Sequence, residues 1–149
     1  MSIAELPSPN FNDRNAPIDI LLLHYTGMQT AKAAIDRLCD PGAQVSAHYV
    51  VDEDGTTYRL VDEENRAWHA GRSAWRGREA CNDYSIGIEC EGADDVPYEP
   101  AQYQTLREVL AVLLEAYPRI TRERVVGHSD VAPGRKTDPG PSFDWSQVR

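Results

Sequence analysis

The chain has 149 residues, and its 15 lysines and arginines against 24 aspartates and glutamates give a formal net charge of −9. A chain of this length suits a single domain that buries roughly 68–70% of its unfolded surface. Nucleic acids and anionic membranes are bound through basic faces, so the acidic balance argues against both as partners. We expect a freely diffusing protein, and a monomer.

Residues 1–12 lack the basic and then apolar pattern of a secretory signal, and no stretch approaches the roughly 20 apolar residues of a membrane span. The three cysteines, Cys39, Cys81 and Cys90, are odd in number and show no C-x-x-C spacing. They predict reduced thiols and a cytoplasmic protein. An export signal trimmed from the chain is the alternative.

Runs of apolar and β-branched residues predict the strands of a sheet. In chain order they are Ile18–Leu23, Val45–Asp52, Thr56–Val61, Tyr84–Cys90 and Val125–Val126. Asp54 and Gly55 make a hairpin of the second and third runs. Residues 1–16 are expected to form an irregular arm because prolines interrupt them, and the polar stretch 62–83 is expected to be a loop.

Two segments have helical character. Apolar residues recur every three or four positions over Gln102–Tyr117, and a shorter helix is predicted over Ala31–Cys39. Strands that alternate with helices, together with one hairpin, indicate the α/β class. We expect a central mixed β-sheet flanked by helices, in one domain over residues 1–149.

Three of the predicted strands lead into polar side chains that can do chemistry. His24 follows the first strand, Glu89 lies at the end of the fourth, and His128 follows the last. In α/β proteins, side chains at strand ends on one side of the sheet form ligand sites. We therefore expect these three side chains to meet.

The turn after His128 is stiffened by prolines and carries Lys136 and Asp138. A catalytic zinc ion takes three protein ligands and keeps one position open. Two imidazoles and a carboxylate suit zinc, so we predict that His24, His128 and Asp138 bind one zinc ion. Each histidine alone would be explained more simply as an ordinary polar residue at a strand end, but the three together favour a metal site.

Glu89 ends an otherwise apolar strand, where burial would raise the pKa of its carboxyl as a general base requires. Glu91 would face the same way if the strand continued, and it is the main alternative. Lys136 is predicted to stabilise the oxyanion that forms at an attacked carbonyl. His48 could orient a metal ligand or simply pack, and His69 could line the cleft.

Five segments carry a family resemblance: Leu21–Thr26, Val45–Gly55, Arg66–Gly71, Cys81–Gly92 and Val126–Pro141. They resemble the zinc-dependent N-acetylmuramoyl-L-alanine amidases, which share their fold with the peptidoglycan-recognition proteins. The most specific segment is Val-Gly-His-Ser-Asp-Val-Ala-Pro-Gly-Arg-Lys-Thr-Asp-Pro-Gly-Pro. From Asn82 onward the chain is most similar to the cytosolic anhydromuramyl-peptide amidases of cell-wall recycling.

The resemblance implies hydrolysis of the amide bond between N-acetylmuramic acid and L-alanine in peptidoglycan fragments. The residues that match His24, His128 and Asp138 bind zinc in that family. The glutamate that matches Glu89 acts on the attacking water, and the lysine that matches Lys136 assists the transition state. We expect substrate contacts from Tyr25, His48, Trp68, His69 and Trp75.

Some departures from the family pattern bear on the substrate. Certain phage relatives use a tyrosine just before the histidine that matches His48, but Ala47 stands there, which leaves Glu89 as the base. Gln44 and Ala80 stand where the recycling enzymes have arginines that meet substrate carboxylates. The alternatives are a non-catalytic peptidoglycan-binding module, which would commonly lack the last zinc ligand, and a lysin that acts on the polymeric wall.

Overall fold

The computed structural model describes residues 2–149 and confirms the mixed α/β class. Its main sheet has the strand order β1-β5-β4-β9-β3-β10. These strands are β1 (Ile3–Glu5), β3 (Ile20–Tyr25), β4 (Tyr49–Val51), β5 (Thr57–Arg59), β9 (Ser85–Cys90) and β10 (Val125–Gly127). Strands β4, β9, β3 and β10 run parallel to one another, while β5 runs antiparallel to β4.

The helices are α1 (Ala31–Leu38), α2 (Pro100–Ala116) and the short α3 (His128–Val131). Single 3-10 turns lie at Cys81–Asp83, Arg122–Arg124 and Trp145–Gln147. Helix α2 begins with Pro100 at its first position, and the side chain of Gln102 accepts a hydrogen bond from the N–H of Glu99 at 2.9 Å. Both features start helices efficiently, and the two helices predicted from periodicity are confirmed.

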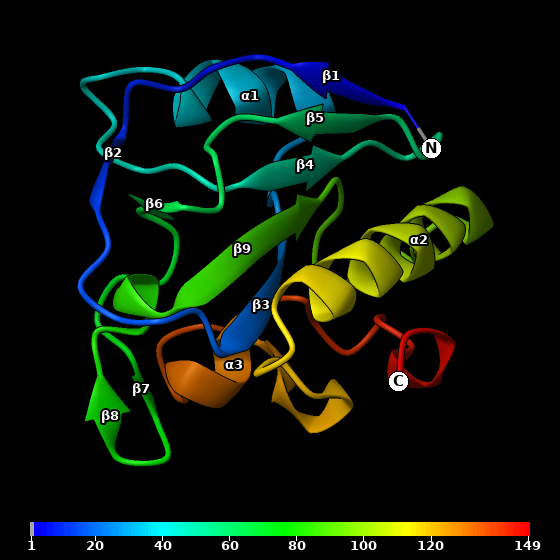
Figure 1. The fold of residues 1–149 in the computed structure, drawn as a ribbon. Helices are drawn as coiled ribbons and strands as arrows, with labels where there is room; N and C mark the ends of the chain where they lie inside the picture. Colours follow the sequence, from blue (N-terminus) through cyan, green and yellow to red (C-terminus); the bar gives the residue numbers. More distant parts are fainter. Residues whose placement is uncertain (1) are drawn as a thin grey trace.

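Alternation along β3 separates two cores on opposite faces of the sheet. Leu21 and Leu23 pack in the core that includes α2, which lies across one face in Figure 1. Ile20 and Leu22 pack in the core that includes α3. His24 continues this second series, so it lies on the face opposite α2.

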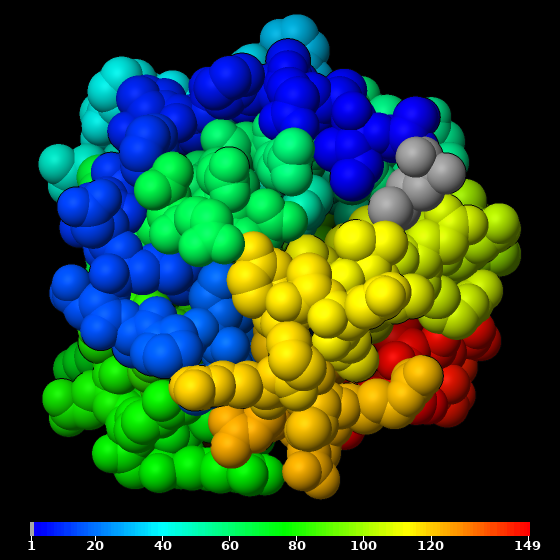
Figure 2. Space-filling model, viewed as in Figure 1, coloured from blue at the N-terminus to red at the C-terminus, as the bar shows by residue number. Residues whose placement is uncertain are grey.

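The sequence suggested an irregular N-terminal arm, but the structure shows that this arm contains strands. Besides β1, it contains β2 (Phe11–Asp13), which pairs antiparallel with β6 (Asn65–Ala67). In Figure 2 the N-terminal segment runs along the upper edge of the molecule. The predicted loop 62–83 likewise contains β6 and a hairpin, β7 (Ala74–Trp75) with β8 (Arg78–Glu79). Strands of two or three residues are too short to show an alternating pattern, which explains both errors.

Several boundaries differ from the predicted ones. Strand β3 extends through Tyr25, so His24 lies inside a strand and not after it. The predicted strand Val45–Asp52 is regular only over β4, and the turn expected after β10 begins with the helical residues of α3. Within residues 2–149, no helix has the length and apolar character needed to cross a bilayer.

Candidate metal centre

The structure brings His24, His128 and Asp138 into one buried cluster whose potential donor atoms all lie within 4.8 Å of one another. Nδ1 of His24 is 2.8 Å from Oδ2 of Asp138 and 3.0 Å from Nδ1 of His128. The third distance in this triangle, from Nδ1 of His128 to Oδ2 of Asp138, is 3.2 Å. Ligands of a tetrahedral zinc ion, with bonds of about 2.0–2.1 Å, lie about 3.3 Å apart. The three atoms therefore form a possible metal site.

Two neighbouring strands and an anchored loop hold these side chains. Strand β10 lies beside β3 in parallel register, which places His128 next to His24. The backbone carbonyl of Asp138 accepts a hydrogen bond from the N–H of Ser129 at 3.0 Å. The hydroxyl of Tyr98 donates to the carbonyl of the following proline at 2.7 Å. The backbone is thus fixed at Asp138 and at the residue that follows it.

The environment of the cluster favours the forms that bind a metal ion, neutral imidazole and ionised carboxylate. Burial lowers the pKa of His24, and the hydrogen bond to Asp138 opposes this only in part. Burial alone would raise the pKa of Asp138. The hydrogen bonds to His128 and His24 outweigh that effect and hold the pKa of this carboxyl below its ordinary value.

Glu89 shares a cavity of about 240 Å³ with the three clustered side chains. It is the register partner of His24 across β3 and β9. Burial, followed by the negative charge of Asp138, raises the pKa of Glu89 to about 8. Glu91 follows the last residue of β9 and does not line this cavity. The geometry therefore favours Glu89 over Glu91 as the carboxyl next to the cluster.

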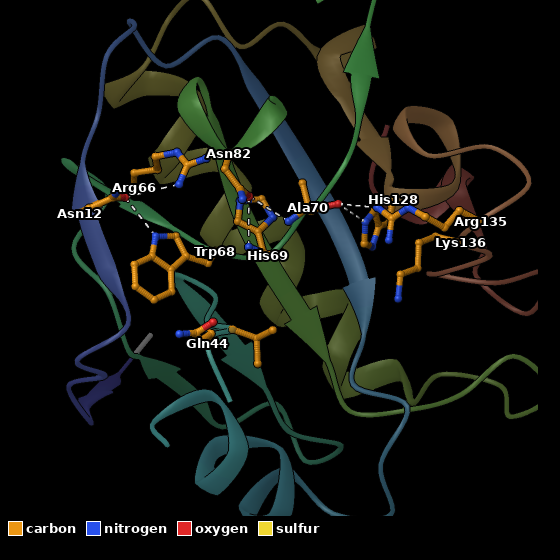
Figure 3. A pocket seen from close by; sticks show the side chains of 12 residues that line it. Asn12, Gln44, Arg66, Trp68, His69, Ala70, Asn82, His128, Arg135 and Lys136 are labelled. Carbon is orange, nitrogen blue, oxygen red and sulfur yellow. Dashed lines mark hydrogen bonds between the residues drawn. The ribbon is translucent and has the colours of Figure 1, made fainter. Parts of the chain in front are cut away.

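A larger cavity of about 540 Å³ opens beside the cluster (Figure 3). We call it the cleft; Val45, Trp68, His69, His128 and Lys136 line both cavities. The indole N–H of Trp68 donates to the side-chain oxygen of Asn12 at 3.0 Å. Arg66 lies at the Trp68 end of the cleft and Arg135 at the other. The exposed Lys136 stands where the two cavities meet.

The five residues expected to contact substrate are distributed unevenly. Trp68 and His69 line both cavities, and Tyr25 lines the smaller one. His48 is 0% exposed and lines neither of them. Trp75 packs against the core on the α3 face and also lines neither. Neither His48 nor Trp75 therefore has the contact with substrate that the sequence suggested.

Arg14 is a half-buried residue that the sequence did not single out. Its guanidinium donates hydrogen bonds of 2.7 to 3.3 Å to the backbone carbonyls of Glu63, Asn82, Asp83 and Ser85. Burial lowers the pKa of Arg14 to about 10. Through its bond to Asn82, the side chain of Arg14 connects the N-terminal arm to a segment that lines the cleft. The only signal in the sequence was an arginine in a short proline-bounded arm, which is too weak to predict this role.

A sheet that places two histidines and a glutamate at adjoining strand ends, beside a loop that carries an aspartate, fits the class of metal-dependent hydrolases. The chain belongs to the N-acetylmuramoyl-L-alanine amidase family, because the family of that description matches residues 14–141. This match confirms the resemblance seen in the sequence.

Individual proteins that are similar to this chain are also amidases of this kind by name. The 1,6-anhydro-N-acetylmuramyl-L-alanine amidase AmpD of Haemophilus influenzae is 40% identical, over 96% of this chain and 88% of that protein. A crystal structure of a selenomethionine AmpD derivative matches with a TM-score of 0.91 and 39% identity, covering 99% of this chain and 92% of that one. Escherichia coli AmiD, solved with anhydro-N-acetylmuramic acid-L-Ala-D-γ-Glu-L-Lys, matches with a TM-score of 0.80 and 39% identity. That match covers 92% of this chain and 59% of AmiD.

Proposed function

We propose that this chain is a zinc-dependent amidase that hydrolyses the bond between (anhydro-)N-acetylmuramic acid and L-alanine in peptidoglycan fragments. One observation carries the proposal: the donor atoms of His24, His128 and Asp138 converge in a cavity that Glu89 and Lys136 also line. The family supports the choice of bond, and the donor set supports the choice of metal.

Zinc suits this donor set better than a harder cation does. Magnesium and calcium prefer oxygen ligands throughout, whereas zinc accepts two imidazole nitrogens and one carboxylate oxygen. His24, His128 and Asp138 would hold the ion, and three protein ligands are the number that a catalytic zinc site uses. When bound, zinc polarises a carbonyl group and lowers the pKa of water to about 7.

The remaining chemistry falls to two side chains of the same cavity. Glu89 takes a proton from the attacking water and passes it to the nitrogen of L-alanine as the C–N bond breaks. Its pKa of about 8 reflects burial and the neighbouring Asp138 in the metal-free protein, and a bound cation would lower that pKa. Lys136 donates to the lactyl carbonyl oxygen as negative charge develops there.

The cleft suits a muramyl peptide. Trp68 offers a flat apolar surface. Arg66 pairs with Asp83 and Arg135 donates to the carbonyl of Ala70, and the remaining guanidinium N–H groups of both arginines can pair with the carboxylates of the stem peptide. The ligand in the AmiD structure joins anhydro-N-acetylmuramic acid to a short peptide, and we propose a substrate of that class. Gln44 also lines the cleft, so the side chain at this position contributes to selectivity among stem peptides.

A non-catalytic peptidoglycan-binding module is the second candidate. Asp138, the ligand that such modules would lack, is present and 4% exposed, which favours the enzyme. We further propose a monomer that acts in cell-wall recycling in the cytoplasm, with residues 1–149 as one domain. The unpaired state of Cys39, Cys81 and Cys90 supports a reducing compartment.

Soluble anhydromuropeptides and intact sacculi, each with and without a chelator, test the function. We expect release of the stem peptide from the soluble fragment, its loss with chelator and its recovery with added zinc. If the chelator left the rate of hydrolysis unchanged on both substrates, the metal mechanism would be contradicted. Faster attack on sacculi than on the soluble fragment would instead indicate a lysin.

A further inference from the structure

We propose that one short loop, residues 68–71, sets the orientation of both metal-binding histidines, with His69 and Asn82 as positioning residues. The inference rests on the proposed metal site and adds residues that are not among its three proposed ligands. Two consecutive residues of the loop each form a hydrogen bond with one histidine of the cluster: His69 with His24, and Ala70 with His128.

Ala70 serves His128 through its backbone. Its carbonyl oxygen lies 2.8 Å from Nε2 of His128. A carbonyl can only accept a hydrogen bond, so Nε2 carries the proton and a neutral His128 keeps a free lone pair on Nδ1. Nδ1 is the atom that faces His24 and Asp138. Ala70 thus selects the tautomer whose lone pair points into the donor triangle.

His69 serves His24 through its ring. Nδ1 of His69 lies 3.0 Å from Nε2 of His24, and the two rings meet edge to face with centroids 5.1 Å apart. With Nδ1 of His24 turned to a metal ion, its Nε2–H donates to Nδ1 of His69. The other ring nitrogen of His69 then donates to the hydroxyl oxygen of Ser85 at 3.1 Å. This chain fixes both the tautomer and the tilt of His24.

Asn82 holds the loop in place (Figure 3). Its side-chain oxygen accepts hydrogen bonds from the backbone N–H of His69 at 3.0 Å and of Ala70 at 2.8 Å. Asn82 is 6% exposed, so water does not compete for these bonds. On the other side, Arg135 donates to the carbonyl of Ala70 at 2.8 Å. One buried amide therefore anchors the peptide units that orient both histidines.

Gly87 makes the room that His69 needs. A Cβ atom at this position would lie 2.5 Å from Cγ and Nδ1 of His69, closer than packed atoms can approach. Gly87 is the register partner of Leu22 in the centre of the sheet. The sheet thus leaves space for the ring of His69 directly beside the strand that carries His24.

Zinc affinity of the full chain, measured by competition with a chromophoric chelator, tests the proposal. His69→Leu removes the acceptor and fills its space, and we expect zinc binding to weaken by roughly 10–100-fold. His69→Asn keeps an acceptor oxygen near the place of Nδ1 and should restore most of the affinity. Asn82→Ala should weaken binding in the same way, and Asn82→Asp, which keeps the acceptor, should restore it.

A matched control separates positioning from general destabilisation. Gln102 is a buried amide of α2 that bonds the backbone of Glu99 and Glu91, so Gln102→Ala should lower stability without changing zinc affinity. If His69→Leu fails to fold, Gly87→Ala crowds the ring without removing a polar group and should weaken zinc binding. In nitrogen-15 NMR of the zinc-loaded protein, the Nε2 proton of His24 should exchange slowly, and faster in His69→Leu.

The outcomes distinguish this inference from the proposed function, because zinc affinity is measured without substrate. Tight zinc binding that depends on His69 and Asn82, without any hydrolysis, would support the inference and contradict the amidase. Active zinc enzyme with full affinity and unchanged proton exchange in both His69→Leu and Asn82→Ala would overturn the inference and leave the amidase standing.

Discussion

His24 and Glu89 are paired directly across the two central parallel strands, β3 and β9. Register partners in a sheet point to the same face, so the proposed ligand and the proposed base enter one cavity without any adjustment of a loop. The sheet carries this half of the site. The segment from His128 to Asp138 carries the other half and docks against it.

The first prediction tests whether Glu89 or Glu91 is the general base. Glu89→Gln should lower turnover by roughly 10²–10⁴-fold, the usual contribution of a general base, and leave zinc affinity within a few-fold. Glu91→Gln is the control and should keep near-full turnover, because Glu91 does not line the cavity. Steady-state kinetics on an anhydromuropeptide decides, and the reverse pattern would assign the base to Glu91.

A second prediction concerns the pH dependence of stability in the metal-free protein. The pKa of Glu89 is about 8, above its ordinary value of 4.5. Between these values the unfolded chain loses a proton that the native chain retains, so the free energy of unfolding falls as pH rises, by at most about 1.4 kcal/mol per pH unit. Glu89→Gln should abolish this fall, and above about pH 8 it should be the more stable protein.

Urea unfolding of the chelator-treated proteins at a series of pH values measures this effect. The stability difference between wild type and Glu89→Gln should vanish near pH 4, where the carboxyl is protonated in both states. A constant difference between the two proteins from pH 4 to pH 9 would contradict the burial of this charge.

Lys136 provides the third prediction. Lys136→Ala should reduce turnover by about 10²–10³-fold, as the loss of one oxyanion contact does, with the fold and the zinc affinity retained. The chain's other lysine, Lys32, is exposed and pairs with Asp36 on α1, so Lys32→Ala is a matched control without effect. Near-full turnover of Lys136→Ala would remove this residue from the mechanism.

The fourth prediction tests the cleft. Trp68→Ala should raise KM about tenfold, which corresponds to about 1.4 kcal/mol of binding, with a smaller change in kcat. Trp75→Ala should leave KM unchanged, since Trp75 packs against the core and lines neither cavity. Equal effects of the two substitutions on KM would show that the cleft is not the substrate site.

Long and regular features were predictable from the sequence. The runs ending at Leu23 and Cys90 and the periodic helix Gln102–Tyr117 gave β3, β9 and α2, because burial imposes its period on the residue pattern. The convergence of His24 and His128 followed from their places at strand ends. Each of these inferences needed only local sequence and one rule of sheet geometry.

The outer layer of the site could not be predicted in the same way. His69 was assigned to the cleft, but its bond to His24 depends on a loop that folds back over Gly87. Asn82 reaches that loop from a 3-10 turn. Such contacts depend on the tertiary fold and leave no period in the sequence, and the same holds for the contacts of the half-buried Arg14.

The fifth prediction concerns the metal itself and is tested by titrating zinc into chelator-treated protein while hydrolysis of an anhydromuropeptide is followed. Turnover should rise in proportion to added zinc and level off at one ion per chain. Asp138→Asn should weaken zinc binding beyond the roughly 10–100-fold expected for outer residues. Full turnover before zinc is added, or wild-type zinc affinity in Asp138→Asn, would contradict a metal centre built from His24, His128 and Asp138.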